Sequence, residues 1–297
     1  MNSYSNPRLL VTGATGFLGS SLLPIALENY EVHYIVHENL SPFSNAYPHQ
    51  VSLNDFSTLA RVIRQIKPSI ILHLAAVTDA NFCEVFPWSA WKINVETTKH
   101  LALIAAQENI KLCFASTDMV FDGEKGNYTE TDVATPISKY GIQKVEAEKI
   151  VLNASSQNAI FRLPLMFGSL AKKNYFAHVI TALKEQKPIK LFTDEYRTIC
   201  GVESVATGII TLLEKANGIF HLGGPQRISR YEFGLLAAKI FKLDSHLIMP
   251  CLQSEIKTTA PRPKDVSLNS TKAIYLGFRP KGLEEELRII AHEATLS

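Results

Sequence analysis

The chain has 297 residues, of which 46% are hydrophobic and 20% charged, and its formal net charge at pH 7 is +2. This composition is typical of a folded globular protein and excludes a largely disordered chain. The near-neutral charge provides no broad basic surface for nucleic acid, and no apolar run reaches the roughly 18 residues that a bilayer span needs. We therefore expect neither a nucleic-acid partner nor a membrane anchor, and the short polar N-terminus predicts a cytoplasmic protein without a signal peptide.

Apolar runs alternate with amphipathic segments through the first half of the chain. The periodicity predicts strands at 8–12, 32–36, 69–73, 111–116 and 159–163, and helices at 16–29, 55–67, 89–107 and 138–152. Strands that alternate with helices of this length indicate right-handed crossovers and a parallel sheet covered on both faces. The predicted fold class is therefore α/β, a doubly wound, Rossmann-like parallel sheet.

After Pro164 this alternation stops, and loops that contain Gly, Pro and Lys follow. We predict a dinucleotide-binding domain at 1–163, with a returning segment at about 201–222, and a smaller C-terminal substrate-binding lobe formed by 164–200 and 223–297. No low-complexity linker separates the two parts, so the lobe should pack on the sheet.

The first candidate site is the glycine motif GATGFLG at 13–19, which follows a predicted strand and opens a predicted helix. Gly13 would permit the tight turn, Gly16 would let the backbone approach phosphates, and Gly19 would let the helix pack close to the sheet. The helix N-terminus would face the anion. Glycines that serve only a turn or packing are the alternative, which the alternating elements downstream disfavour. The predicted cofactor-binding residues of the motif are Gly13, Thr15, Gly16, Phe17, Leu18 and Gly19.

The end of the second strand bears on the choice between NADP and NAD. An acidic residue there would bind the ribose 2′-hydroxyl, whereas a basic residue suits a 2′-phosphate. The predicted strand closes on Val36 and His37 follows, which favours NADP. Glu38, one residue further, keeps NAD open as the alternative.

No metal or redox site is predicted. His33 and His37 have the spacing of a helical metal pair, but they lie on a predicted strand, where this spacing does not form one. The four cysteines lie far apart without a Cys-x-x-Cys pair, so we expect reduced, buried, apolar side chains. They are Cys83, Cys113, Cys200 and Cys251.

The second candidate site is Tyr140 with Lys144, four residues apart on one face of a predicted helix. A neighbouring ammonium favours the ionised phenol, so we expect Lys144 to lower the pKa of Tyr140 into the range of acid–base catalysis. The preceding strand ends in Ser116-Thr117-Asp118. Because ligands of an open parallel sheet bind beyond the carboxyl ends of its strands, Thr117 and Tyr140 can converge on one carbonyl oxygen. A solvent-exposed helix pair is the alternative.

Together these motifs resemble those of an extended short-chain dehydrogenase/reductase. The chain is most similar to the branch that contains dTDP-4-dehydrorhamnose reductase and the regulatory β subunit of methionine adenosyltransferase. The segments that carry the resemblance are 11–19, 74–78, 94–95, 116–123, 140–144, 162–164, 194–198, 221–225 and 262–263, with Leu268.

The resemblance implies that hydride passes from a nicotinamide to a sugar keto carbon while Tyr140 donates a proton to its oxygen. Thr117 would hold that oxygen, Lys144 would bind the nicotinamide ribose, and Asn94 would support the site from the preceding helix. The further cofactor-binding residues that it implies are His37, Leu53, Ala75, Ala76, Thr78, Tyr140, Lys144 and Leu163. The residues expected at the substrate, a nucleotide-sugar, are Thr117, Asp118, Met119, Arg197 and Arg262, the arginines because guanidinium groups match phosphate oxygens.

Three positions depart from the family pattern. Met119 stands where the rhamnose-pathway reductases carry Tyr, and Leu165 where they carry Trp, so the stacking surface for that sugar differs. Ser52 replaces an Asp that commonly meets the adenine. Sugar-nucleotide dehydratases carry a Glu base at the position of Met119, which cannot abstract a proton, so we expect reduction rather than elimination.

Three functions stay open. The first is an NADP-preferring reductase of a keto-sugar nucleotide or a related small carbonyl compound. The second is an NADP-binding regulatory subunit without turnover, like the adenosyltransferase β subunit. The third is a superfamily epimerase, or a reductase whose substrate has no nucleotide. A homodimer through the helices at 89–107 and 138–152 is open by analogy alone.

Overall fold

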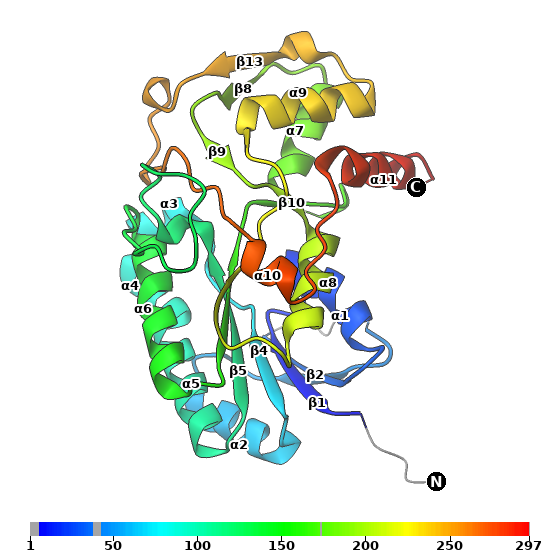
Figure 1. Ribbon diagram of the computed structural model, residues 1–297. Helices are drawn as coiled ribbons and strands as arrows, with labels where there is room; N and C mark the ends of the chain where they lie inside the picture. Colours follow the sequence, from blue (N-terminus) through cyan, green and yellow to red (C-terminus); the bar gives the residue numbers. More distant parts are fainter. Residues whose placement is uncertain (1–5, 38–42, 173, 297) are drawn as a thin grey trace.

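The computed structural model describes residues 6–37, 43–172 and 174–296, and its centre is a seven-stranded sheet (Figure 1). Every strand pair in this sheet is parallel, in the order β11-β6-β5-β4-β1-β2-β3. The order reverses between β1 and β4, which confirms the predicted doubly wound α/β fold. The strands are β1 (Arg8–Thr12), β2 (Glu31–Val36), β3 (Tyr47–Gln50), β4 (Ile70–His73), β5 (Lys111–Thr117), β6 (Ala159–Leu163) and β11 (Gly218–His221).

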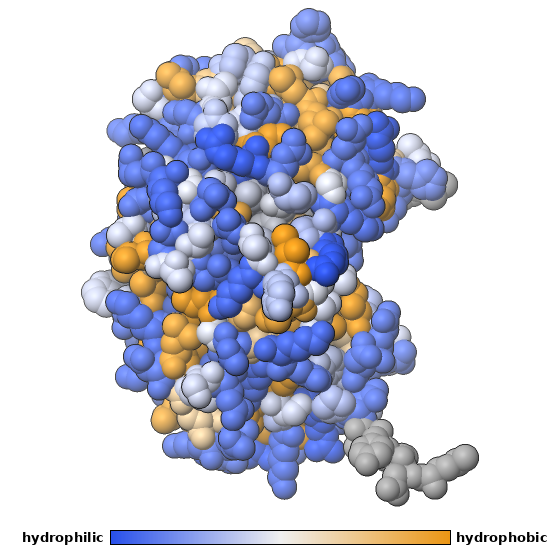
Figure 2. Space-filling model, viewed as in Figure 1, coloured by the Kyte–Doolittle hydropathy of each residue, from blue (hydrophilic) through white to orange (hydrophobic). Residues whose placement is uncertain are grey.

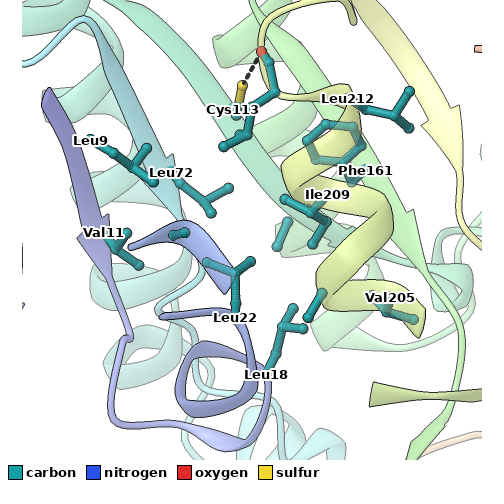
Figure 3. Close-up of a cluster of buried hydrophobic side chains, with 14 of the residues drawn as sticks. Leu9, Val11, Leu18, Leu22, Leu72, Cys113, Phe161, Val205, Ile209 and Leu212 are labelled. Atoms are coloured by element: carbon teal, nitrogen blue, oxygen red, sulfur yellow. Dashed lines mark hydrogen bonds between the residues drawn. The ribbon is translucent and has the colours of Figure 1, made fainter. Parts of the chain in front are cut away.

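Helices cover both faces of the sheet because strand side chains alternate between two apolar cores. Leu9 and Val11 of β1 belong to the core under α1 (Phe17–Ala26) and α8 (Val202–Leu212). Leu10 belongs to the opposite core, which also contains residues of α2 (Phe56–Ile66), α5 (Thr97–Gln107) and α6 (Lys139–Ala154). Figure 3 shows the first core, where the strand side chains meet those of the two helices: Leu9, Val11, Leu72 and Phe161 against Leu18, Leu22, Val205, Ile209 and Leu212.

Several elements differ from their predicted bounds. The helix predicted at 16–29 ends at Ala26. The helix predicted at 89–107 consists of α4 (Pro87–Trp91), a π-helical turn (Lys92–Glu96) and α5, and the Thr97 N–H bonds to the Lys92 carbonyl oxygen across the wide turn. Strand β3 and helix α3 (Ala80–Val85) were not predicted, because each is too short to give a clear period.

Beyond β6 the structure is more regular than the sequence predicted. Helix α8 packs beside α1, β11 joins the central sheet and α10 (Thr271–Tyr275) contacts β11, while α7, α9, α11, β8 and β13 lie above the sheet in the view of Figure 1. The division into two domains stays a prediction. Three further two-stranded sheets form here, in which β7 pairs with β10, β8 with β13 and β9 with β12. The elements are β7 (Met166–Phe167), α7 (Tyr175–Lys184), β8 (Ile189–Phe192), β9 (Tyr196–Arg197), β10 (Cys200–Gly201), β12 (Ile228–Ser229), α9 (Arg230–Phe241), β13 (Ile248–Cys251), α10 (Thr271–Tyr275) and α11 (Leu283–Leu296).

The four cysteines are buried and unpaired, as predicted. The ring nitrogens of His33 contact His49 at 3.0 Å and Glu31 at 2.9 Å. In the part of the chain that the structure describes, no helix is both long and apolar enough to cross a membrane. Hydrophilic residues cover most of the face in Figure 2, with apolar residues between them. Leu103 of α5 and Ile142 of α6 are exposed, and a homodimer through these helices stays a prediction.

Candidate active-site cleft

A cleft of about 600 Å³ opens beyond the carboxyl ends of β1, β4, β5 and β6. It brings together most residues that the sequence indicated for a cofactor, a substrate or proton transfer. The predicted residues that line it are Gly13, Gly16, Phe17, Leu18, Gly19, Ala75, Ala76, Thr78, Thr117, Asp118, Met119, Tyr140, Lys144, Leu163, Arg197 and Arg262. The two motifs that lie far apart in the sequence therefore face one cavity.

Four predicted residues do not line this cleft. Thr15 is exposed on the glycine turn, and His37 is exposed just beyond β2. Leu53 packs against the core under α2 and α5, where its carbonyl oxygen accepts a hydrogen bond from Thr97. Asn94 is buried behind the cleft wall. Glu38, the residue that kept NAD open, lies outside the described residues.

The glycine turn packs closely against its neighbours and leads into the N-terminus of α1. Gly13 has a φ of +73°, and a Cβ there would lie 2.7 Å from the Ala75 backbone nitrogen. The Gly16 N–H bonds to the Gly13 carbonyl oxygen and Gly16 caps α1. A Cβ on Gly19 would lie 2.3 Å from the Gly13 oxygen, so Gly19 lets α1 pack closely against the turn that follows β1. This close-packed trough fits the backbone approach that a dinucleotide pyrophosphate requires.

Helix α6 presents Tyr140 and Lys144 on its buried face, as their spacing predicts. The helix begins after Ser138, whose hydroxyl accepts a hydrogen bond from the Gly141 N–H at 3.1 Å. The Lys144 Nζ donates to the Ala115 carbonyl oxygen at 2.5 Å and lies 3.9 Å from the centre of the Phe114 ring. Burial lowers the pKa of Lys144 to about 7, and the Glu148 carboxylate opposes this shift. Lys144 is thus a buried base that titrates near neutral pH.

The pKa of Tyr140 departs from the expectation. Burial and then the Asp118 carboxylate raise it well above the ordinary value for a phenol, while a hydrogen bond with Thr117 opposes the shift. The prediction that Lys144 lowers the pKa of Tyr140 is therefore wrong for this structure, since loss of hydration penalises the charged phenolate more than its neighbours stabilise it. At neutral pH the phenol keeps its proton.

A cluster of arginines and carboxylates forms the far wall of the cleft. Arg197 contacts Asp118 at 2.8 Å and Glu195 at 3.2 Å, and Glu195 also pairs with Arg230 at 2.8 Å. Burial would raise the pKa of Glu195, but Arg230 and Arg197 outweigh it and hold this pKa at about 2. Arg197, predicted to bind substrate phosphate, is thus buried between two carboxylates of its own chain.

Arg262 differs from Arg197 because its guanidinium has no carboxylate partner among the described residues. Its Nε is buried without a hydrogen-bond partner. Arg262 lies between the cleft and a second cavity of about 430 Å³, since it lines both. The other residues that line the second cavity are Asp194, Gln253, Ser254, Thr258 and Lys264. Arg262 is therefore placed to contact an anionic group of a ligand that occupies both spaces.

The sequence reasoning missed Arg230, the third arginine of the cleft. Arg230 is the first residue of α9, where Ser229 and Glu232 form a capping box. That local signal could have located the start of the helix. It could not have placed Arg230 at the cleft, because the position of this helix end depends on the pairing of β12 with the distant β9.

The predicted supporting residue Asn94 holds the cleft wall instead of facing the cavity. Its side-chain oxygen accepts from the Val77 N–H at 2.8 Å, and its amide donates to the Val77 carbonyl oxygen at 3.0 Å and to Gln143 at 2.8 Å. Asn94 lies in the π-helical turn, a feature that is frequent at functional sites. Its side chain thus connects segment 74–78 to helix α6.

Comparison with known proteins finds matches over nearly the whole chain. Residues 7–295 match the family described as RmlD substrate binding domain. Methionine adenosyltransferase 2 subunit beta of Pongo abelii is 31% identical, over 95% of this chain and 87% of its own length. dTDP-4-dehydrorhamnose reductase of Aggregatibacter actinomycetemcomitans is 29% identical, over 95% and 98%. The structure of dTDP-4-dehydrorhamnose reductase from Bacillus anthracis str. Ames in complex with NADP superimposes with a TM-score of 0.87 at 25% identity, over 97% of this chain and 99% of that one.

Proposed function

Because the chain belongs to the RmlD substrate binding domain family, we propose that it is an NADP-dependent reductase of a carbonyl group. Family membership confirms the predicted resemblance to the extended short-chain dehydrogenases/reductases of the dTDP-4-dehydrorhamnose reductase type. The observation that carries the proposal is that Tyr140, Lys144 and Thr117 line the same cleft as the glycine turn.

The cofactor would lie along the trough that Gly13 and Gly16 leave open. The N-terminus of α1 would take the pyrophosphate, segment 74–78 and Leu163 would flank the rest, and Lys144 would bind the nicotinamide ribose. NADP is proposed over NAD because a related reductase is solved with NADP and because the basic His37 follows β2. When bound, the nicotinamide supplies the hydride that reduces the carbonyl carbon.

Tyr140 would supply the proton. A carbonyl oxygen held by Thr117 gains negative charge as its carbon accepts hydride, and the phenol donates its proton to that oxygen, so that the product is the neutral alcohol. The raised pKa of Tyr140 means that the phenol carries its proton before reduction, and it also makes the phenol a weaker acid.

The substrate proposed is a nucleotide-sugar with a keto group. Arg262 offers a cationic contact in the cleft, and the second cavity beyond it offers room for the nucleotide. Guanidinium groups suit the diphosphate that links sugar and nucleoside. The relative from Aggregatibacter actinomycetemcomitans, which is named for a reductase of this substrate class, supports the choice.

A regulatory subunit without turnover is the second candidate. The similarity to methionine adenosyltransferase 2 subunit beta, at 31% identity over most of the chain, is the observation that favours it. Both candidates would bind NADP. Only the reductase would consume it with a carbonyl substrate.

The test is a fluorescence titration of the purified protein with NADPH and NADH. Assays of NADPH oxidation with each member of a panel of 4-keto-hexose nucleotides follow. NADPH binding with turnover that Tyr140→Phe abolishes would support the reductase. NADPH binding without turnover on any panel member would favour the regulatory role or a substrate without a nucleotide. Binding of neither cofactor would refute the proposal.

A further inference from the structure

A buried histidine outside the cleft connects the ends of two central strands to helix α5. His73 is the last residue of β4 and is fully buried. Its Nδ1 lies 2.6 Å from the hydroxyl of Thr12, the last residue of β1. Its Nε2 lies 3.1 Å from the hydroxyl of Thr98 on α5.

The neighbouring hydrogen bonds determine which ring nitrogen carries the proton. The Thr98 hydroxyl donates to the Asn94 carbonyl oxygen at 2.9 Å, so its oxygen accepts from His73 Nε2–H. Nδ1 then accepts from the Thr12 hydroxyl, whose oxygen accepts from the Ala75 N–H at 3.3 Å. Each hydroxyl donates once and accepts once, and the imidazole is neutral. Burial lowers the pKa of His73 to about 3, which is consistent with this state.

Both ends of this chain of hydrogen bonds hold the same segment of the cleft wall. At one end, Thr12 binds the Ala75 N–H. At the other, the carbonyl oxygen of Asn94 accepts from Thr98 while its side chain binds both backbone groups of Val77. Segment 74–78 is therefore fixed at two points two residues apart.

The position of this segment sets the width of the trough. Ala75 lies directly against Gly13, where even a Cβ would be 2.7 Å from its backbone nitrogen. Asn94 also donates to Gln143, the residue before Lys144 on α6. A shift of segment 74–78 would therefore change its distance from the glycine turn on one side and from the Tyr140 helix on the other.

We propose that His73 is a positioning residue for dinucleotide binding, acting through Thr12, Thr98 and Asn94 on segment 74–78. His73 does not line the cleft, so it acts on the cofactor only through these residues. Loss of the imidazole leaves the Thr12 hydroxyl without its acceptor and the Thr98 hydroxyl oxygen without its donor, so that both groups, and the segment they hold, can move to find new partners. The inference rests on the proposed function in one respect, that the dinucleotide is NADP.

The fold provides a matched control for the test. His221 is also fully buried at the end of a strand of the same sheet, β11, and its pKa is likewise lowered to about 3. Its ring nitrogens contact the Tyr128 carbonyl oxygen and Arg162, and it does not line the cleft. His73→Phe and His221→Phe therefore remove equivalent imidazoles, of which only the first is bonded to the trough.

The experiment is a titration of wild type and both variants with NADPH, after circular dichroism has established that they are folded. We expect His73→Phe to raise the Kd for NADPH about tenfold or more and His221→Phe to change it less than about twofold. Thr98→Val should weaken binding in the same direction as His73→Phe, and Thr98→Ser, which keeps the hydroxyl, should restore it. If His73→Phe does not fold, the comparison of Thr98→Val with Thr98→Ser tests the inference.

If wild type binds NADPH, the proposed function stands, and two results would overturn the inference. In the first, neither His73→Phe nor Thr98→Val weakens NADPH binding. In the second, His221→Phe weakens NADPH binding as much as His73→Phe does. A wild-type protein that binds no NADPH would instead refute the proposed function, and this role for His73 with it.

Discussion

The guanidinium Nη1 of Arg197 lies 2.8 Å from the carboxylate Oδ2 of Asp118, the residue that follows Thr117. Both side chains are almost fully buried, and Arg197 also contacts Glu195. The pair joins strand β9 to the carboxyl end of β5, beside the proposed reaction centre. Because removal of one partner of a buried pair leaves an uncompensated charge, Arg197 should contribute mainly to the fold of the cleft wall and Arg262 to substrate binding.

Arg197→Gln and Arg262→Gln should therefore separate stability from affinity. We expect Arg197→Gln to lower the free energy of unfolding by about 3–5 kcal/mol, since Asp118 would remain buried without its partner and Glu195 would keep only Arg230. Arg262→Gln should change stability by less than about 1 kcal/mol and raise KM for a nucleotide-sugar substrate. Urea unfolding and steady-state kinetics check both. Equal losses of stability in the two variants would contradict this assignment.

Tyr140→Phe should remove the proton donor and leave cofactor binding intact. We expect kcat to fall by about 10²–10⁴-fold with an unchanged Kd for NADPH. Tyr30→Phe is the control, because Tyr30 is also buried and its hydroxyl donates to Glu214, but it lies outside the cleft. Single-turnover oxidation of NADPH provides the measurement. A Tyr140→Phe variant with wild-type turnover would exclude Tyr140 as the acid.

Lys144→Met should stabilise the protein in a pH-dependent way while it impairs function. The folded chain holds Lys144 at a pKa of about 7, below the ordinary 10.5, so between these values the unfolded chain binds more protons and stability rises with pH. Below pH 7 Lys144 is charged in both the folded and the unfolded chain, so the full free-energy cost of burying the ammonium lowers stability. At roughly pH 6 the variant should gain about 1–3 kcal/mol, and the gain should disappear near pH 10.

Urea unfolding of Lys144→Met at both pH values, with NADPH titration alongside, tests this expectation. The control is Lys149→Met on the same helix, where the lysine is exposed. A stability gain for Lys149→Met equal to that for Lys144→Met would show that burial of the charge is not its cause.

The two buried histidines should make the fold sensitive to acid. His73 and His221 have pKa values of about 3 in the folded chain, lowered from 6.5 by burial, so below pH 6.5 the unfolded chain binds more protons. Above pH 6.5 both imidazoles are neutral in the folded and the unfolded chain. As the pH falls from 6.5 towards 3, the free energy of unfolding decreases by about 1.4 kcal/mol per pH unit for each histidine. In His221→Phe the slope of unfolding free energy against pH should decrease by this amount between roughly pH 4 and pH 6. An unchanged slope would mean that His221 does not stay neutral.

Local sequence patterns were sufficient for the central sheet and for the two motifs of the cleft. Strands β1 and β6 have the predicted bounds, because a run of apolar residues between polar ones needs only its neighbours to be recognised. Tyr140 and Lys144 share a buried face because the helical period alone places residues four apart on one side. Gly13 occupies a left-handed turn directly after β1, as the strand–glycine–helix order indicates.

The fold class, the family, and the presence of a glycine turn and a Tyr–Lys pair thus follow from local patterns along the chain. The contacts of those side chains follow from the way distant segments pack together. The pKa of Tyr140, the capture of Arg197 by Asp118 and Glu195, and the bonds of His73 to Thr12 and Thr98 all depend on residues far apart in the chain. Burial and charge act through space, whereas periodicity and turn propensity act along the sequence.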